Sequence, residues 1–393
     1  MTDRESRYRA YLEARAEAGL ERRLLPLGRS DARTIQVGGR RYLNLSSNDY
    51  LGLSTHSDLI ARAREWAARY GAGSAASRLV TGNLDVFEAL ERKVARLKDK
   101  PAALILASGF QANAAVLQAL LDRKVLGAEP LVFADRLNHA SMHFGCSAAG
   151  ARQLRYRHCD LAHLEQLLAR HAASEAPKVI LTESVFSMDG DVAPMDEIVR
   201  LARAHDALVV CDDAHATGVL GKGGQGLSGG ADIVIGTFSK ALGSYGAFVA
   251  CSETVRDFLV NACTGLIYST ALPPAVLGAM DAALDLLPAL EPERQKVAAL
   301  AARFRAAAQA RGYDTGASGT QIVPLIVGEA AAALDLSQRL REAGVWATAI
   351  RPPTVPKGTA RLRLAFSAAH GEDDLDGLLD ILANATEPKK VTA

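Results

Sequence analysis

Short apolar runs alternate with helical patterns through the middle of the chain, and this alternation is the feature that most restricts the fold. Six runs have the continuous apolar character or the two-residue period of buried strands, and a helical pattern separates most of them. Such alternation is typical of a layered α/β domain with a mostly parallel sheet, whose ligand binds beyond the carboxyl ends of the strands. The expected strands are Ala103–Ala107, Leu131–Ala134, Val179–Thr182, Leu208–Cys211, Ile233–Ile235 and Phe248–Ala250, and the expected helices are Asp85–Lys98, Gly109–Leu121, Leu161–His171 and Met195–His205.

The pattern changes after the last of these strands. The last two strands are too close for a helical crossover, so we expect one antiparallel neighbour. Beyond Leu272-Pro-Pro274 an alanine-rich helical region runs to about Arg311, and a smaller α+β domain follows. Its expected elements are Ile322–Val327, Leu334–Ala343, Val345–Ile350, Arg361–Phe366 and a helix from Asp373. The predicted division is an N-terminal helical arm at 1–46, a large domain at 47–282 and a small domain at 283–393.

The charge balance gives no reason to expect nucleic acid or a membrane surface as the partner, because 45 Lys and Arg residues stand against 44 Asp and Glu residues. We therefore expect a small-molecule partner. The first residues are charged and lack an apolar signal core, and no run of 18 apolar residues occurs. The cysteines form no Cys-x-x-Cys pair, which is typical of reduced thiols, so we expect a cytoplasmic protein. They are Cys146, Cys159, Cys211, Cys251 and Cys263.

A lysine, a carboxylate and an imidazole follow the ends of two predicted strands. Lys240 follows the strand Ile233–Ile235, and Asp212 and His215 follow the strand Leu208–Cys211. Pyridoxal phosphate (PLP) requires a lysine that forms a Schiff base with its aldehyde, a carboxylate that keeps its ring nitrogen protonated, and donors for its phosphate and phenolate oxygens. These strand ends therefore predict a PLP enzyme.

The neighbouring residues supply the other expected contacts of that cofactor. Asp212 is the better partner for the ring nitrogen, because Asp213 lies one residue on and should point to the other face of the strand. His215 can then reach the phenolate oxygen. Ser108-Gly109-Phe110 follows a strand and opens a helix, so its N–H groups and the helix dipole can hold a phosphate dianion. Thr237 can add a hydroxyl to that phosphate.

Two other motifs favour different chemistry only weakly. Gly226-Leu-Ser-Gly-Gly230 matches the G-x-S-x-G pattern of hydrolases, but it follows a glycine-rich loop and not a strand. His158, Cys159 and His163 could imitate a metal cluster, yet nothing supplies a fourth ligand at a standard spacing. We expect the latter residues to be solvated surface, and we expect no metal site.

Seven stretches that cover nearly the whole chain resemble the α-oxoamine synthases, which are PLP enzymes of the aspartate aminotransferase fold (fold type I). The first six are general to that family, whereas the run Arg351–Pro356 points to the branch that serves biotin biosynthesis. The loop Gly71–Arg78 departs from the family pattern, because relatives often carry more glycine there. The stretches are Leu43–Leu53, Ala134–Ser141, Thr182–Asp191, Asp212–Gly218, Thr237–Lys240, Tyr268–Thr270 and Ile350–Leu364.

The resemblance implies a fold and several cofactor contacts. The fold would be a large domain with a mostly parallel seven-stranded sheet, joined to a smaller C-terminal α+β domain. His139 resembles the family's residue stacked on the pyridine ring, and it counts among the catalytic and substrate-binding residues. Ser187 would lie beside the cofactor. Thr270 resembles a residue that a partner subunit lends to the phosphate, so the resemblance implies a homodimer with shared active sites.

The resemblance also implies residues that bind the substrate. A carboxylate suits the two-pronged geometry of an arginine. We prefer Arg363 for the amino-acid carboxylate and hold Arg351 as the second choice. The alternative is that Arg361 and Arg363, which share one side of a predicted strand, are solvent-exposed side chains without a role in binding. The other implied positions are Arg22, Asn48 and Thr354.

The implied reaction is a decarboxylative condensation of L-alanine with a pimeloyl thioester, carried by coenzyme A or an acyl carrier protein. It would give 8-amino-7-oxononanoate, carbon dioxide and the free thiol. Two alternatives stay open. One is a sister enzyme that joins glycine to acetyl-CoA with the same catalytic groups, and the other is a non-catalytic subunit that keeps the fold for assembly.

Overall fold

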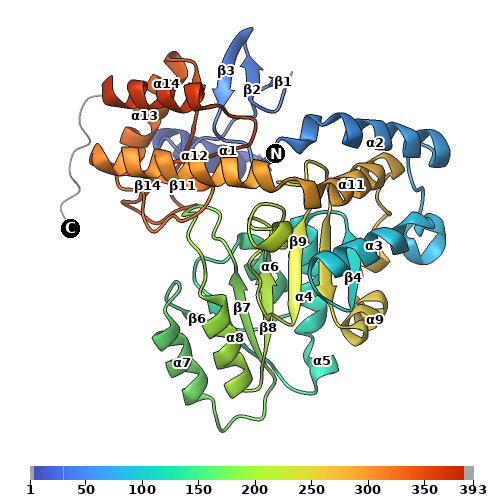
Figure 1. Cartoon of the computed structure of the whole chain (residues 1–393). Coiled ribbons are helices and arrows are strands. Elements are labelled where there is room, and N and C mark those ends of the chain that lie inside the picture. The colour runs from blue at the N-terminus through green and yellow to red at the C-terminus, as the bar shows by residue number, and fades with distance from the viewer. Residues whose placement is uncertain (1–3, 30, 385–393) are drawn as a thin grey trace.

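Seven strands form one sheet through the centre of the structure, a computed structural model that describes residues 4–29 and 31–384 (Figure 1). The strand order is β4-β10-β9-β8-β7-β5-β6; β10 runs antiparallel to both of its neighbours, and the other pairs are parallel. This confirms the mostly parallel sheet with an antiparallel strand. The strands are β4 (Ala102–Leu106), β5 (Leu131–Asp135), β6 (Gln153–Tyr156), β7 (Lys178–Glu183), β8 (Ala207–Asp212), β9 (Ile233–Thr237) and β10 (Ala247–Cys251).

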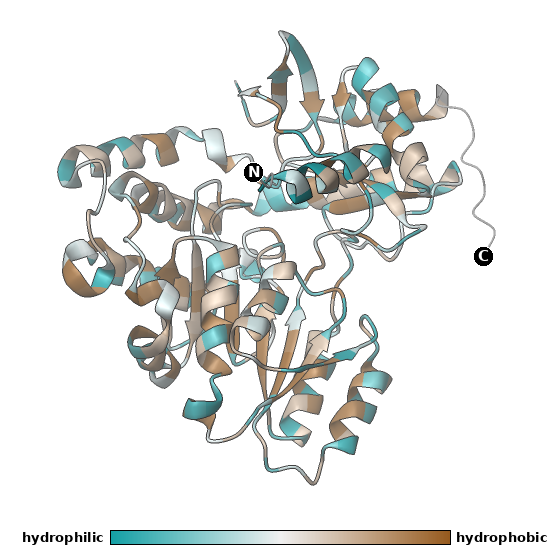
Figure 2. Cartoon of the chain, turned by 180° about the vertical axis from the view of Figure 1, so that it is seen from behind, coloured by the Kyte–Doolittle hydropathy of each residue, from teal (hydrophilic) through white to brown (hydrophobic). Residues whose placement is uncertain are grey.

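Helices cover both faces of this sheet, because its strands alternate apolar side chains between two cores. In β4, Ala103 and Ile105 belong to one core, and Leu104 and Leu106 belong to the other. Figure 2 shows these strands as brown segments between helices that change from brown to teal around their circumference. The four helices expected here are present to within one residue at their ends. One face packs on α3 (Val86–Leu97), α7 (Leu161–Arg170) and α8 (Met195–Ala204), and the other on α4 (Gly109–Leu120), α6 (Ala140–Ala148) and α9 (Glu253–Ala262).

The C-terminal part has its own three-stranded sheet and apolar core. The prediction of one strand at Val345–Ile350 is wrong. This segment forms two strands in different sheets, because β12 (Val345–Trp346) pairs in parallel with β3 and β13 (Thr348–Ile350) pairs with β14. The other elements are β11 (Ile322–Gly328), β14 (Ala360–Ala365), α12 (Glu291–Ala310), α13 (Ala330–Glu342) and α14 (Glu372–Asn384).

The N-terminal strands join the C-terminal part, although they come from the opposite end of the chain (Figure 1). Of the expected helical arm, α1 (Ser6–Glu17) is a helix, whereas much of 28–44 is strand. The division of the chain at 46 and 282 stays a prediction. These strands are β1 (Gly28–Arg29), β2 (Thr34–Val37) and β3 (Arg40–Asn44).

Two further helices lie side by side above the large sheet (Figure 1). They are α2 (Ser57–Tyr70) and α11 (Pro274–Leu286), and Arg62 of α2 forms an ion pair with Asp281 of α11. The short helices α5 (Arg123–Leu126) and α10 (Thr264–Ile267) connect larger elements. None of the helices among the described residues combines the length and the apolar character needed to cross a membrane.

Candidate active site

Lys240 lies in the turn between β9 and β10, at the edge of the sheet where the parallel strands end. Its Nζ atom is 2.8 Å from Nε2 of His215. Burial lowers the pKa of Lys240 to about 8, although the carboxylates of Asp212 and Glu183 act in the opposite direction. A lysine in this setting gives up its proton far more readily near neutral pH than a surface lysine does.

A glycine allows the segment before α2 to approach this turn. Gly243 has a φ of +63°, and a Cβ atom at this position would lie 2.4 Å from the backbone of Leu53. Only glycine adopts this conformation at such a close contact without strain. The turn that carries Lys240 and the Asn48–Leu53 segment are therefore packed together.

His215 connects Lys240 to Tyr50, a residue that the sequence reasoning missed. The Tyr50 hydroxyl lies 2.7 Å from Nδ1 of His215 and is fully buried. It donates to Oδ1 of Asn48 at 3.1 Å, and it accepts a hydrogen bond from Nη2 of Arg363 at 3.3 Å. Burial holds the pKa of His215 well below its usual value, and the positive charge of Lys240 adds to this effect. The structure thus brings Lys240, His215, Asn48 and Arg363 into one hydrogen-bonded cluster around Tyr50.

Asp212 and Asp213 have separate partners, as their successive positions at the end of β8 predict. Oδ2 of Asp212 accepts a hydrogen bond from Nδ2 of Asn113 at 2.6 Å, and Oδ1 accepts one from the backbone N–H of Ala214 at 2.9 Å. Asp213 is fully buried on the other side, where it pairs with the equally buried Nζ of Lys98 at 2.5 Å. Asp213 therefore has a structural partner, and the role of Asp212 toward a cofactor stays a prediction.

His139 is the N-cap of α6 and lies close to Asp212 and Lys240. Burial lowers its pKa, and the negative charge of Asp212 partly offsets this effect. The structure adds Glu183, which the sequence reasoning also missed. Glu183 pairs in register with Asp212 on the neighbouring strand and is 2% exposed, and its Oε1 has no hydrogen-bond partner among the described residues. Burial raises the pKa of Glu183 well above its usual value, and the nearby Asp212 carboxylate raises it further.

The first turn of α4 provides donors for a phosphate. The Ser108 hydroxyl caps this helix, and the N–H groups of Gly109 and Phe110 lie in the first turn, where amides have no partner within the helix. Thr237 is close, since a Cβ atom at Gly109 would lie 3.8 Å from the Cβ of Thr237. However, the Thr237 hydroxyl donates to a backbone carbonyl just before β10 and also contacts the hydroxyl of Ser239. Ser239 is a second hydroxyl at this place, and the sequence reasoning did not identify it.

Two arginines of β14 reach the loop that follows β7. Nε of Arg363 donates to the backbone carbonyl of Ser187, and Nη1 of Arg361 pairs with the carboxylate of Asp189. Arg361 is 3% exposed and Arg363 is 7% exposed, so the alternative of a solvated strand face is wrong. Ser187 is thereby placed next to Arg363.

Arg22, Thr354 and Arg351 lie together in a different place. They line a cavity of about 690 Å³ between the segment after α1 and the C-terminal part. Nη2 of Arg22 donates to Oγ1 of Thr354 at 3.4 Å, and Nη1 of Arg351 donates to the carbonyl of Gly19. The structure therefore separates Arg351 from the hydrogen-bonded cluster that contains Arg363.

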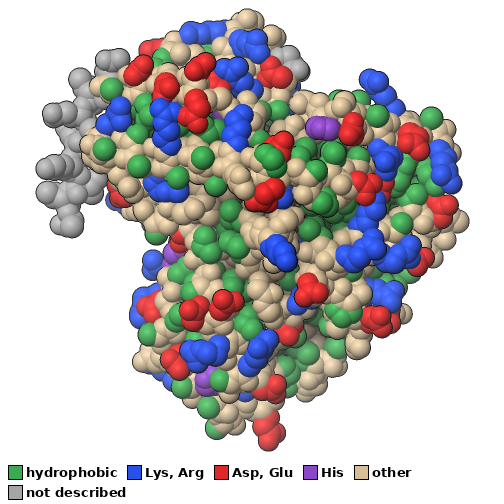
Figure 3. Space-filling model, viewed as in Figure 1, with side chains coloured by type: hydrophobic (Ala, Val, Ile, Leu, Met, Phe, Trp, Pro, Cys, Tyr) green, Lys and Arg blue, Asp and Glu red, His purple; other side chains and the backbone are tan. Residues whose placement is uncertain are grey.

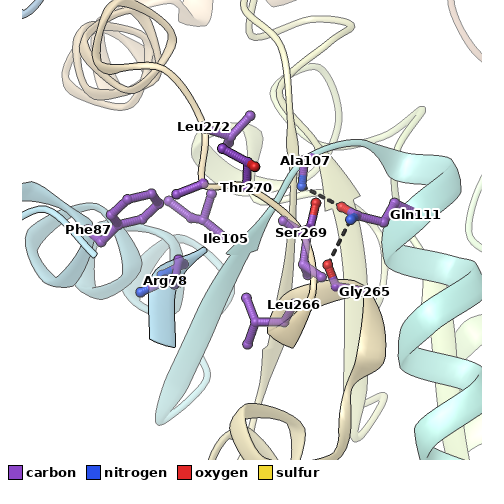
Figure 4. A pocket seen from close by; sticks show the side chains of 12 residues that line it. Arg78, Phe87, Ile105, Ala107, Gln111, Gly265, Leu266, Ser269, Thr270 and Leu272 are labelled. Carbon is purple, nitrogen blue, oxygen red and sulfur yellow. Dashed lines mark hydrogen bonds between the residues drawn. The ribbon is translucent and has the colours of Figure 1, made fainter. Parts of the chain in front are cut away.

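Thr270 is exposed at the molecular surface near the end of β4 (Figure 4). Its backbone forms an isolated antiparallel bridge with Ser77. It lines a small pocket of about 20 Å³ together with Arg78 and Gln111, whose side chain links Ala107 to Gly265 as the dashed lines in Figure 4 show.

The three residues of the possible metal cluster do not share one site: His163 has its own partner, while His158 and Cys159 lie near Asp135. His163, in the first turn of α7, accepts a hydrogen bond from the backbone N–H of Arg157, the residue after β6. The potential ligand atoms of Asp135, His158 and Cys159 lie within 4.8 Å of one another. However, the two ring nitrogens of His158 are bound to carboxylates, Nδ1 to Asp135 at 3.0 Å and Nε2 to Asp191 at 2.6 Å. This histidine links Asp135, at the end of β5, to Asp191, in the loop after β7, and it is only partly exposed, so the expectation of solvated surface does not describe it.

Comparison with known proteins gives consistent matches. The family model of aminotransferase class I and II matches residues 40–382. An 8-amino-7-oxononanoate synthase from Gluconacetobacter diazotrophicus is 55% identical over 371 residues, which cover 93% of each chain. A solved serine palmitoyltransferase from S. paucimobilis with bound PLP has a TM-score of 0.89 at 25% identity and covers 98% of each chain. A solved 8-amino-7-oxononanoate synthase from Francisella tularensis has a TM-score of 0.75 at 26% identity, covering 88% of this chain and 97% of that one.

Proposed function

Because the chain belongs to the class I and II aminotransferase family and, within it, to the PLP-dependent 8-amino-7-oxononanoate synthases, we propose that it condenses L-alanine with a pimeloyl thioester. The products are 8-amino-7-oxononanoate, carbon dioxide and the free thiol carrier, so the reaction serves biotin biosynthesis. The observation that carries this proposal is the contact of 2.8 Å between Nζ of Lys240 and Nε2 of His215, at the strand edge where Asp212 and Arg363 also lie.

The side chains at this edge fit the polar groups of PLP. Lys240 offers a partly deprotonated amine for the aldehyde, and Asp212 offers a carboxylate that both of its protein partners hold in place. The first turn of α4 offers N–H groups for the phosphate. When bound, PLP withdraws electrons from the α-carbon of the attached amino acid and so makes its proton acidic.

The residues of the cluster then have distinct tasks. Lys240 takes the α-proton of alanine, since its pKa of about 8 matches a base that works near neutral pH. Asp212 holds the proton on the ring nitrogen, which is electrostatic stabilisation of the developing negative charge. His215 would contact the phenolate oxygen of the cofactor, and His139 would stack on its ring. Arg363 binds the amino-acid carboxylate, because it lies in the cluster with Lys240 and Arg351 does not.

The remaining assigned residues divide between cofactor and substrate. Ser108, Gly109 and Phe110 would hold the phosphate, Thr237 would join them once its hydroxyl turned away from the carbonyl of Gly246, and Ser187 would lie beside the ring. On the substrate side, Asn48 lies near the amino-acid carboxylate. Arg22, Thr354 and Arg351 bind the acyl substrate at the cavity of about 690 Å³. Leu24 and Leu25 also line this cavity, so it offers apolar surface for methylene groups together with cationic side chains.

We further propose a homodimer in which Thr270 contacts the phosphate of the neighbouring subunit. Large apolar side chains are exposed around Thr270, and such a patch is typical of an interaction surface. The bridge between Ser77 and Thr270 and the bond from Gln111 to Gly265 bring most of the segments that carry these side chains together, and the ring centroid of Phe144 lies 5.5 Å from that of Phe110. The exposed residues are Leu79, Val80, Phe110, Phe144 and Tyr268.

Because the five cysteines of the chain are free thiols, we expect the protein to work in the cytosol.

A product assay by mass spectrometry tests the reaction. The enzyme is incubated with alanine, serine or glycine and with pimeloyl-, acetyl-, succinyl- or palmitoyl-CoA, and pimeloyl carrier protein is tested beside pimeloyl-CoA. We expect alanine with a pimeloyl thioester to give the dominant product. A dominant product from glycine and acetyl-CoA would establish the sister activity instead, and a protein without a visible cofactor absorption band would be a non-catalytic subunit.

A further inference from the structure

A chain of buried hydrogen bonds connects Asp212 to His139. Nδ2 of Asn113 donates to Oδ2 of Asp212 at 2.6 Å and to Oγ of Ser141 at 3.0 Å. Oγ of Ser141 lies 2.7 Å from Nδ1 of His139, and the backbone N–H of Ser141 donates to the same Nδ1 at 3.3 Å. Asn113 is 1% exposed and Ser141 is fully buried. The chain joins the end of β8, helix α4 and the N-terminus of α6.

The direction of each hydrogen bond in this chain follows from the groups involved. A carboxylate only accepts, so the NH2 group of Asn113 must face Asp212, and its second hydrogen faces Ser141. A backbone N–H only donates, so Nδ1 of His139 is the acceptor and carries no proton. The Ser141 hydroxyl therefore accepts from Asn113 and donates to Nδ1.

The cost of this arrangement indicates that both bonds of the Asn113 NH2 group are required. Its Oδ1 is buried without a partner among the described residues, and an unpaired buried acceptor destabilises a protein. If the amide group were rotated by 180°, Oδ1 would face the Asp212 carboxylate, which has no hydrogen to donate, and Ser141 would lose the donor that it has in the NH2 group. The orientation is thus fixed by Asp212.

We propose that Asn113 and Ser141 are positioning residues that hold His139 as a neutral imidazole with its proton on Nε2, so that His139 presents an N–H donor, and not a base, to the bound substrate. Among the described residues none bonds to Nε2, which leaves that donor for a ligand. The part about the substrate rests on the proposed function, whereas the tautomer depends only on the protein.

The charged and titratable groups around His139 come from several elements. Asp212 of β8 favours the charged imidazolium, whereas Lys240 and His143 of α6 disfavour it. Glu183 of β7 lies near the backbone N–H of His139, which partly offsets the rise in the pKa of Glu183 caused by burial. A substitution at Ser141 leaves all four groups in place and so isolates the effect of the hydroxyl.

Nitrogen NMR of the purified holoenzyme, labelled with 15N-histidine, tests this inference. The His139 signals are those lost in His139→Gln. We expect an unprotonated Nδ1 and a protonated Nε2 in the native protein. Ser141→Ala removes a donor that stabilises the neutral ring, so the proton affinity of His139 should rise roughly two- to tenfold, which is the effect of one hydrogen bond. Ser141→Thr should restore the native midpoint, and Ser141→Cys, which keeps a weaker donor, should shift it less than Ser141→Ala.

The matched control is Ser318→Ala, which removes another buried serine hydroxyl, one that donates to the carbonyl of Ile322 at 2.6 Å. It should leave the His139 signals unchanged. A proton on Nδ1 in the native protein, or the same midpoint in Ser141→Ala and the native enzyme, would overturn the proposal. A native tautomer as expected in a protein that fails the product assay would contradict the proposed function alone.

Discussion

At the scale of single residues, Lys240 has the clearest consequence for activity. Lys240→Ala should abolish turnover, because the Nζ of Lys98, the other amine near this end of β8 among the described residues, is held in a buried ion pair with Asp213, while some PLP should still bind through its phosphate. Borohydride reduction of the native enzyme followed by peptide mapping should place the pyridoxyl group on Lys240. Lys222→Ala, which changes an exposed lysine, is the control and should keep full turnover. A label on any other lysine would contradict the assignment.

Asp212 is tested by a substitution that preserves its shape. A neutral amide cannot hold a proton on the ring nitrogen of the cofactor, so Asp212→Asn should slow the exchange of the α-proton of alanine by orders of magnitude, at tenfold for each 1.36 kcal/mol of barrier. The exchange is measured by NMR in deuterated water, and the fold is checked by circular dichroism. Near-normal exchange would mean that Asp212 does not have this role.

A substitution of Asp213, the next residue, should mainly lower the stability of the protein and have a smaller effect on the reaction. Asp213→Asn leaves the fully buried ammonium of Lys98 without a carboxylate. Removing one partner of a buried ion pair costs about 3–5 kcal/mol, so the free energy of unfolding in urea should fall by roughly this amount. The exchange rate per folded molecule should fall far less than in Asp212→Asn. An equal loss of stability in both variants would refute this distinction.

At the scale of elements, His158 fixes two of the loops that carry the site. It joins Asp135, at the end of β5 before His139, to Asp191, in the loop that carries Ser187. Burial lowers the pKa of His158, but its hydrogen bonds to both carboxylates outweigh this effect and raise the pKa to about 12. The raised pKa means that the folded protein binds this proton more tightly than the unfolded chain does.

The sign of the resulting pH dependence follows from linkage. The contribution of His158 is fully present below the unfolded pKa of about 6.5 and declines as the pH rises from there through the folded pKa. Urea unfolding should therefore show a larger difference in stability between the native protein and His158→Gln at pH 6 than at pH 9. An equal difference at both values would indicate a neutral His158.

The elements themselves were largely predictable, because buried strands and amphipathic helices leave a periodic pattern. Two cases show where this signal ends. The edge strand β6 is missing from the expected strands, since Gln153–Tyr156 has only four residues, contains no continuous apolar run and is mostly not buried. The segment Val345–Ile350 has one uninterrupted strand pattern, yet its halves pair with β3 and β14, and a choice between distant partners leaves no local pattern.

The same reasoning explains which site residues were found. Lys240, Asp212 and His215 follow predicted strands, so the topology alone brings them to one edge. Tyr50 and Asn113 come from a loop and a helix, and their contacts with His215 and Asp212 depend on packing across more than 90 residues of sequence. The Asn48-Asp-Tyr50 stretch was within the resemblance, and it was the available signal for Tyr50.

At the scale of the whole molecule, the balanced net charge gives no reason to expect a charged macromolecule as the partner. Figure 3 shows Lys and Arg side chains interspersed with Asp and Glu side chains on the face in view, in line with a formal net charge of +1. One surface feature that bears on the site is the exposed apolar group around Thr270. At this scale, the proposed homodimer with shared sites is the property to test.

A mixed dimer tests whether the sites are shared. One subunit carries Lys240→Ala and the other Thr270→Ala, with different tags so that the mixed form can be purified. If Thr270 serves the neighbouring site, one site of the mixed dimer combines both substitutions, and the other keeps both Lys240 and Thr270. The mixed dimer should then have about half of the native activity and one site of native PLP affinity, because a phosphate keeps all of its donors there. If Thr270 serves its own subunit, every site lacks one residue, and the activity should not exceed half of that of the Thr270→Ala parent. That outcome, or a native monomer with full activity, would refute the shared site.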